Sequence, residues 1–290
     1  MELYKVGSHG QFGGLPELGK EPPVDWLIKG WLPGNELSCL YGKGGTFKSY
    51  IALGWTMQLA AHGHRTLYIA AEGSSGLRSR AEAWMVQRGL DNERLKGWNY
   101  YNSNLHIDTQ GSRLSWIRGA QLYLEKRYSP PKRKRASTAD DGERGEPGVD
   151  LVVVDTLARN FIGDENSPKE MGAFVEGCED IRRELGTAVL VIHHTRKDGK
   201  GERGTESLRN ATFAMYRTSD PRYTQSGGGS VVVECERMKD APTPPAVRVR
   251  FDTVSIDIDR NGEVHKESQS MRHFPPKPPM QKVPESADKS

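Results

Sequence analysis

Short apolar runs alternate with helical patterns along the first two thirds of the chain. The runs at 149–156 (VDLVVVDT) and 187–195 (TAVLVIHHT) are almost continuously apolar, which is typical of strands buried on both faces. Two further runs, at 36–42 and 65–72, also predict strands. Helical periodicity follows in three segments: KSYIALGWTMQLAAHG, LRSRAEAWMVQRG and SRLSWIRGAQLYLEKRY.

The last helix of this series carries its own start signal. Ser167 is placed to cap it, Pro168 suits the first turn, and Glu170 completes a capping box, so we expect a helix running to about Gly186. Beyond 195 the pattern becomes β-rich, with SGGG as a turn. Alternating strands and helices followed by hairpins favour an α/β fold, with a mainly parallel twisted sheet flanked by helices and C-terminal β-hairpins.

Two segments show no apolar periodicity. Residues 127–148 combine proline, glycine and charged residues, and we expect a flexible surface insertion there. The segment 260–290 is similar, and we expect a disordered tail. The chain therefore divides into an N-terminal arm at 1–23, one folded domain at 24–259 and the tail.

Composition indicates a soluble protein. Charged residues make up 27% of the 290 residues and the mean hydropathy is −0.68. No apolar run is long enough to span a membrane, and the first residues lack an apolar signal core, so we expect a cytoplasmic protein with no membrane partner. Cys39, Cys178 and Cys235 lack metal-ligand spacing and are expected to be buried free thiols. The net charge is only +3, so any contact with nucleic acid must come from local clusters.

Residues 40–53 (LYGKGGTFKSYIAL) have the features of a phosphate-binding loop, with one exception. The loop leaves a strand and enters a helix, whose N-terminus favours anions. Lys48 is suited to the outer phosphates and the Ser49 hydroxyl to Mg²⁺. A glycine-rich connector is the alternative. We expect Mg-ATP to be bound by Gly42, Lys43, Gly44, Gly45, Thr46, Phe47, Lys48, Ser49 and Tyr50.

The exception is Phe47, which stands where the last glycine of such loops is usual. If the backbone there has a positive φ, a side chain costs roughly 1–2 kcal/mol. If the position is already helical, Phe47 is tolerated and covers one side of the nucleotide. We favour the second interpretation, because every other element is in place.

Three strand ends supply further candidate residues. Asp155 ends the run at 149–156, where a carboxylate supports Mg²⁺ beside Ser49. Glu72 ends a neighbouring strand and is placed to activate the attacking water, because the carboxyl ends of parallel strands converge on one crevice. His193 and His194 point to opposite faces of their strand, and we expect His194 to face the phosphates. Structural roles, such as capping a turn or filling the core, are the alternatives for each.

Taken together, these segments resemble the RecA-type P-loop ATPases, and specifically the plasmid and phage replication helicases of the RepA type. The resemblance rests on DWLIKGWLPGNELSCLYGKGGTFKS, LYIAAEGSSGLRSRAEAW, VDLVVVDTLARN and VLVIHHTRKDGKGERGTESLRNATF, which lie within 24–218. It implies a RecA-like ATPase domain at 24–259, Glu72 as catalytic base and His194 as the strand-end histidine. It also implies that Arg203, in ERGTES, reaches across a subunit interface of a homo-oligomeric ring, typically a hexamer around single-stranded DNA.

The resemblance has departures. Phe47 replaces the more usual glycine, and we expect no primase or collar domain before the ATPase core. A replication initiator or a primase remains a candidate partner in phage or plasmid replication.

Two loops are expected to face the DNA in such a ring. They follow the Asp155 and His194 strands, and the second carries Arg196, Lys197 and Lys200 among glycines, which suits phosphate contact. An ordinary solvated loop is the alternative. The function expected from the resemblance is an ATP-dependent helicase or translocase. An ATP-binding recombination mediator or regulatory oligomer without processive unwinding is the competing hypothesis.

Overall fold

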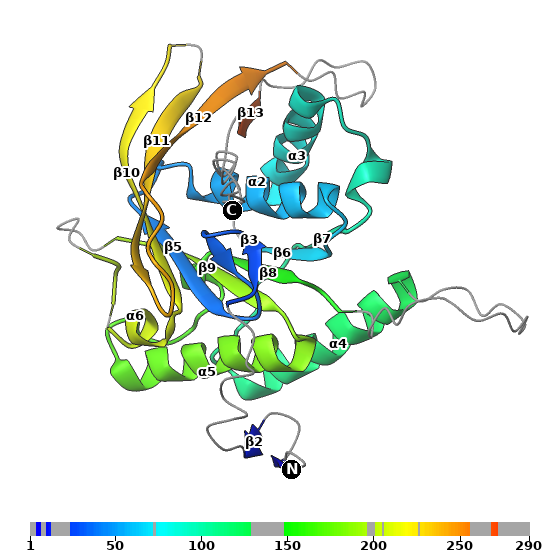
Figure 1. The fold of residues 1–290 in the computed structure, drawn as a ribbon, viewed down its shortest axis with the longest axis vertical. Helices are drawn as coiled ribbons and strands as arrows, with labels where there is room; N and C mark the ends of the chain where they lie inside the picture. The colour runs from blue at the N-terminus through cyan, green and yellow to red at the C-terminus, as the bar shows by residue number, and fades with distance from the viewer. Residues whose placement is uncertain are drawn as a thin grey trace, which may run out of the picture.

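The computed structural model describes residues 24–71, 74–128, 148–195, 201–204, 206–225 and 227–255, together with three short strands near the ends of the chain. These three strands are β1 (Tyr4–Val6), β2 (Gly10–Phe12) and β13 (Ser268–Met271). Figure 1 shows one large twisted sheet with helices on both sides. No helix among the described residues combines the length and the apolar character needed to cross a lipid bilayer.

The central sheet has nine strands in the order β13-β12-β11-β10-β5-β9-β8-β6-β7. Its parallel part consists of β10 (Ala214–Tyr223), β5 (Leu37–Gly42), β9 (Ala188–His194), β8 (Leu151–Asp155), β6 (Thr66–Ala70) and β7 (Trp98–Tyr101). The antiparallel part continues from β10 through β11 (Gly229–Met238) and β12 (Val247–Val254) to β13. A separate small ladder joins β3 (Trp26–Ile28) and β4 (Leu32–Pro33).

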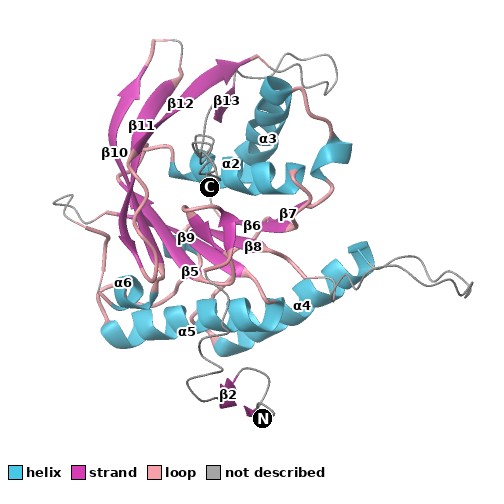
Figure 2. Cartoon of the chain, in the orientation of Figure 1, coloured by secondary structure: helices cyan, strands magenta, loops and turns pink. Residues whose placement is uncertain are grey.

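Helices cover the two faces of the sheet unequally (Figure 2). On one face α2 (Lys48–Ala61) and α3 (Ser74–Arg88) pack over a core that includes Leu40, Trp55 and Tyr68. On the other face lie α4 (Gln110–Tyr128), α5 (Pro168–Leu185) and the short α6 (Ser207–Ala211), over a core that includes Phe174 and Val152. Single 3₁₀ turns, η1 (Asn92–Leu95) and η2 (Leu157–Arg159), complete the described elements.

The predicted α/β class is confirmed, with a mainly parallel sheet and late antiparallel strands. The predicted start and end of α5 are also confirmed. The side chain of Ser167 accepts from the Glu170 N–H, Pro168 occupies the first turn, and Gly186 ends the helix at a φ of 59°. Cys39, Cys178 and Cys235 are buried free thiols, as expected.

Two predicted segments meet described elements at their margins. Helix α4 continues to Tyr128 and Gly148 is again described, while residues 129–147, most of the expected insertion at about 127–148, lie outside the described part. The segment 260–290, predicted to be disordered, contains β13, whose backbone pairs with β12 from Val254 to Phe251. This pairing joins two strands separated by residues 255–267, and local composition does not reveal it.

Candidate nucleotide-binding site

The predicted phosphate loop lies between β5 and α2, at the carboxyl end of a central strand. β5 ends at Gly42 and α2 begins at Lys48, with no acidic residue in its first turn. The free N–H groups and the positive end of the helix dipole therefore face the loop without a competing carboxylate. This arrangement is a ready site for an anion.

Two glycines of the loop are required by geometry. A Cβ on Gly42 would lie 1.8 Å from Oγ1 of Thr218, so only glycine allows β10 to pack this closely. Gly45 has a φ of +78°, which side chains rarely adopt. The loop is also tied to β10 by side chains, since the hydroxyls of Thr46 and Thr218 share a hydrogen bond of 2.7 Å.

The preferred interpretation of Phe47 is wrong. Its backbone is left-handed, with φ 58° and ψ 17°, so the position is not yet helical and retains the conformation that favours glycine. The ring is buried and stacks on Phe251 at a centroid distance of 4.3 Å and an interplanar angle of 12°. Tyr50 and Tyr223 complete the aromatic cluster around it. Packing against the C-terminal strands, rather than a relaxed backbone, accommodates Phe47.

Lys48 is buried beneath the loop that it is expected to serve. Its Nζ donates to the carbonyl oxygens of Gly42 and Lys43, at 3.0 and 2.8 Å. These bonds hold the ammonium at the base of the loop, where a phosphate oxygen would exchange for a carbonyl.

A hollow of about 510 Å³ opens beside the loop. Seven of the nine predicted binding residues line it, and Gly42 and Lys43 do not. His194 lines it as predicted. Three further residues come from other elements and were not predicted: Arg80, Thr156 and Tyr223.

Arg80 and Tyr223 bring specific contacts to this hollow. The guanidinium of Arg80, on α3, lies 4.9 Å from the centroid of the Tyr50 ring, which places a cation on the wall. The hydroxyl of Tyr223 donates to the carbonyl of Gly45 at 2.9 Å. Arg80 lies within the segment LYIAAEGSSGLRSRAEAW, on which the family resemblance rests in part, whereas Tyr223 lies outside every segment quoted for it. A helical pattern alone does not tell which face of α3 meets the loop.

Asp155 lies at the carboxyl end of β8, as predicted, and is almost fully buried. The hydroxyl of Tyr68 donates to the carboxylate of Asp155 at 2.5 Å and approaches the carbonyl of Ser49 at 3.4 Å. Tyr68 thus connects the two residues predicted to support Mg²⁺. Burial, followed by the charge of Asp155, raises the pKa of Tyr68 well above its usual range, so the phenol keeps its proton.

The two histidines at the end of β9 have different surroundings. His193 is fully buried, and its Nε2 lies 2.8 Å from the carbonyl oxygen of Arg203. Burial lowers the pKa of His193 to about 4, so the ring is neutral at physiological pH. His194 is only partly buried and lines the hollow, which agrees with the predicted orientation.

Arg203 does not lie in the hollow of its own chain. Its Nε lies 2.9 Å from a carboxylate oxygen of Glu165, and Arg203 is 56% exposed while Glu165 is 10% exposed. Arg203 therefore has an acidic partner within its own chain. Its backbone is fixed to the same strand end, since its N–H donates to the His194 carbonyl at 2.8 Å.

The remaining predicted residues lie outside the described part of the chain. They are Glu72, Arg196, Lys197 and Lys200. Among the described residues, no group of three or more His, Cys, Asp or Glu side chains is arranged to hold a metal ion by itself.

Comparison with known families gives one match. A family model described as AAA domain covers residues 12–200, well over half of the 290 residues. The matched part contains the phosphate loop, Asp155 and His194. No curated protein sequence matches the chain.

Proposed function

Because the chain belongs to the AAA domain family of P-loop ATPases, we propose that it hydrolyses ATP to move along single-stranded DNA, as a RecA-like helicase or translocase of phage or plasmid replication. The observation that carries the proposal is the hollow in which the phosphate loop, His194 and Arg80 meet. A loop with these side chains at a helix N-terminus suits a nucleotide triphosphate.

The residues present fit Mg-ATP. Lys48 would hold the outer phosphates, and the α2 N-terminus would receive phosphate oxygens from its N–H groups. Ser49 and Asp155 offer a hydroxyl and a carboxylate, the hard oxygen donors that Mg²⁺ prefers, and both border Tyr68. Bound Mg²⁺ supplies neutralisation of the charge that develops on the phosphates.

Hydrolysis is assigned to residues around the phosphates. Glu72 deprotonates the attacking water, and His194 contacts the outer phosphate from the end of β9. Arg203 completes the site of a neighbouring subunit in a homo-oligomeric ring. This assignment is supported by its exposure and by its position outside the hollow of its own chain.

Single-stranded DNA is assigned to the loop after β9. Arg196, Lys197 and Lys200 would neutralise DNA phosphates, and that loop continues directly from the strand that carries His194. Occupancy of the nucleotide hollow would thereby act on the DNA contact through β9. A competing function, a recombination mediator or regulatory oligomer, shares the site but does not unwind duplexes.

The test is steady-state ATP hydrolysis with and without single-stranded DNA, followed by displacement of a labelled strand from a forked duplex. We expect stimulation by DNA and ATP-dependent displacement, both abolished in the Lys48→Ala protein. DNA stimulation without displacement would favour the mediator. Equal hydrolysis in wild type and Lys48→Ala would refute the ATPase site itself.

The DNA loop is tested by replacing Arg196, Lys197 and Lys200 with alanine. Each phosphate contact removed should lower the slope of log affinity against log salt by about 0.7 for a single strand. Retention of the wild-type slope would place the DNA contact elsewhere. Nucleotide affinity is the internal control, because these residues are not assigned to ATP.

A further inference from the structure

Strand β7 forms one margin of the central sheet. It pairs with β6 on one side, and no described strand pairs with its other side. The Thr66 N–H donates to the Gly97 carbonyl, and backbone groups alternate along a strand. The N–H and C=O groups of Trp98 and Tyr100 therefore point away from β6, toward the free edge.

A hollow lies on each face of this edge. The first, of about 550 Å³, lies between β7 and α4, with a floor of Leu67, Leu105 and Ala120. The second, of about 680 Å³, lies between β7 and the α2–α3 layer, with a floor that includes Leu77 and Leu95. Tyr100 lines both. Figure 1 shows β7 at the margin of the sheet, with α2 and α3 on one side and α4 on the other.

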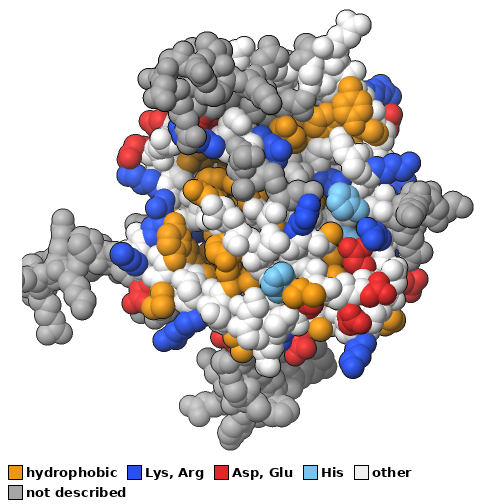
Figure 3. All heavy atoms as spheres, turned by 180° about the vertical axis from the view of Figure 1, so that it is seen from behind, with side chains coloured by type: hydrophobic (Ala, Val, Ile, Leu, Met, Phe, Trp, Pro, Cys, Tyr) orange, Lys and Arg blue, Asp and Glu red, His pale blue; other side chains and the backbone are white. Residues whose placement is uncertain are grey.

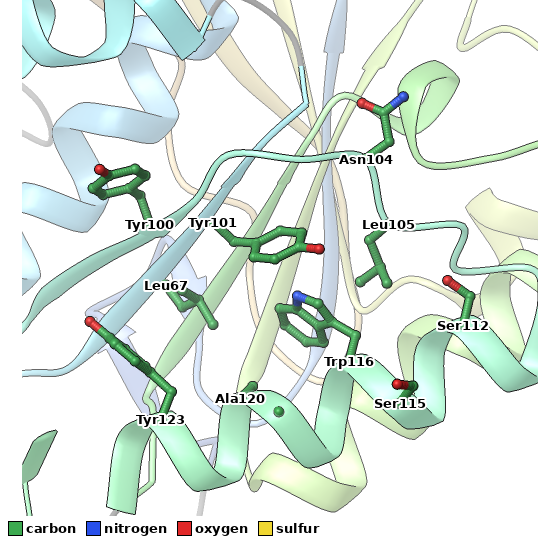
Figure 4. A pocket seen from close by; sticks show the side chains of 11 residues that line it. Leu67, Tyr100, Tyr101, Asn104, Leu105, Ser112, Ser115, Trp116, Ala120 and Tyr123 are labelled. Atoms are coloured by element: carbon green, nitrogen blue, oxygen red, sulfur yellow. The ribbon is translucent and has the colours of Figure 1, made fainter. Parts of the chain in front are cut away.

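The first hollow has rigid aromatic walls (Figure 4). Tyr101 and Trp116 approach each other edge to face, at a centroid distance of 5.9 Å. Tyr123 is held by a hydrogen bond from its hydroxyl to Oδ1 of Asn99, at 2.9 Å. Tyr100 is 56% exposed although it is large and apolar. Walls that are already ordered lose little entropy when a ligand binds.

Helix α4 contributes a second unusual feature. Gly119 lines the hollow in the middle of the helix, and a Cβ there would meet no atom of the described chain within 4 Å. A glycine in a helix interior is unfavourable by roughly 1 kcal/mol relative to alanine. No contact within the described chain accounts for it. Open space above Gly119 leaves room for an incoming chain.

These features identify the kind of ligand. Side chains of an added strand point alternately to the two faces of a sheet, so one strand at the β7 edge would fill both hollows with neighbouring residues. Figure 3 shows the face opposite to that of Figure 1, where hydrophobic side chains lie in several groups among charged ones.

Helix α4, which borders the first hollow, carries exposed positive charge. Arg118, Lys126 and Arg127 are exposed on this helix, with Glu125 as the one acidic residue among them, and Arg127 lines the second hollow. None of the three cations forms a salt bridge with a residue that the structure describes. An acidic flank on the incoming strand would complement this surface.

We propose that the β7 edge is a peptide-binding site, which takes an extended segment of a partner protein as an added strand. The segment has two or three consecutive apolar residues, whose side chains enter the two hollows in turn, and acidic residues beside them. The site is distinct from the nucleotide hollow, with which it shares no lining residue.

The test begins with a displayed library of peptides of roughly ten residues, a length that spans one strand, selected on the full chain. Counter-selection uses the Gly119→Trp protein, in which an indole fills the first hollow. Gly111→Trp is the matched control, because Gly111 is also on α4 with nothing within 4 Å of its Cβ and does not line the hollow. We expect peptides with an apolar centre and acidic flanks, bound about tenfold or more weakly by Gly119→Trp and unchanged by Gly111→Trp.

Backbone pairing is tested on a selected peptide by N-methylation of alternate amides. Methylation of one alternate set should abolish binding, while methylation of the other set leaves it intact, because only one set faces β7. Equal effects of the two sets would refute strand addition. Failure of the library to yield peptides that distinguish wild type from Gly119→Trp would refute the site, and displacement of the peptide by an oligodeoxythymidine strand would identify a nucleic-acid surface instead. Unchanged ATP binding by Gly119→Trp separates this result from any failure at the nucleotide site.

Discussion

Because the backbone at Phe47 is left-handed, we expect glycine at this position to give a more stable protein than alanine, the reverse of the usual order in a helix. Replacing Phe47 by alanine removes a buried ring that stacks on Phe251, and such a loss typically costs 3–5 kcal/mol, roughly, in the free energy of unfolding. Replacement by glycine removes the same ring but also relieves a φ of 58°, a strain of about 1–2 kcal/mol for a residue with a Cβ. In the opposite direction, the unfolded chain has more conformational entropy with glycine than with alanine, which lowers the free energy of unfolding by roughly 0.4–1 kcal/mol. The Phe47→Gly protein should therefore be more stable than Phe47→Ala by about 0.5–1 kcal/mol.

The measurement is urea unfolding of both variants, with Gln58 as the matched control position. Gln58 lies within the same helix α2, after the first turns, where alanine is favoured over glycine by about 1 kcal/mol. The order of stability should therefore reverse between the two positions. An alanine variant at position 47 that is at least as stable as the glycine variant would refute the strain. If neither variant is much less stable than the wild type, the stacking of Phe47 on Phe251 does not stabilise the fold as argued.

Five further outcomes are expected. Lys48→Ala should weaken nucleotide binding strongly in a fluorescence titration, and Glu72→Gln should keep binding while turnover falls about 10²–10⁴-fold. Burial lowers the pKa of His193 from 6.5 to about 4, so the unfolded chain binds a proton at this residue more readily than the folded chain. The free energy of unfolding should therefore be highest above pH 6.5 and should fall by about 3 kcal/mol as the pH drops toward 4. A His193→Gln protein should lack that part of the pH dependence of unfolding. Mixing the inactive Lys48→Ala and Arg203→Ala proteins should restore part of the ATPase activity if Arg203 acts in trans, and Glu165→Gln should change hydrolysis only under conditions in which subunits associate.

Local signals in the sequence were sufficient for elements that local chemistry determines. The α5 helix was predicted at both ends, because Ser167, Pro168 and Gly186 act within a turn of their own positions. The buried runs of β8 and β9 were predicted because strands covered on both faces must be apolar throughout.

Features that depend on distant partners were missed. Strand β7 reads as WNYY, with no alternation, and is a strand because it pairs with β6. The conformation of Phe47 was misjudged because its stabilising partner, Phe251, lies in a strand near the other end of the described chain. Glu165 lies in none of the segments quoted for the resemblance, and Arg80 lies in one whose pattern does not show what its side chain contacts. Arg80 lies beside the nucleotide hollow because of how α3 packs. Glu165 lies beside Arg203 because of how the loop before α5 packs.

The attachment of the phosphate loop to the C-terminal strands has a consequence for synthesis on the ribosome. The contacts that brace the loop are complete only when Thr218, Tyr223 and Phe251 have reached it, yet all three lie beyond residue 200, where the family match ends. A nascent chain that has already emerged past the whole matched segment would still have an unbraced loop. ATP would then have no formed site on the unfinished protein, and nucleotide capture would begin only late in translation.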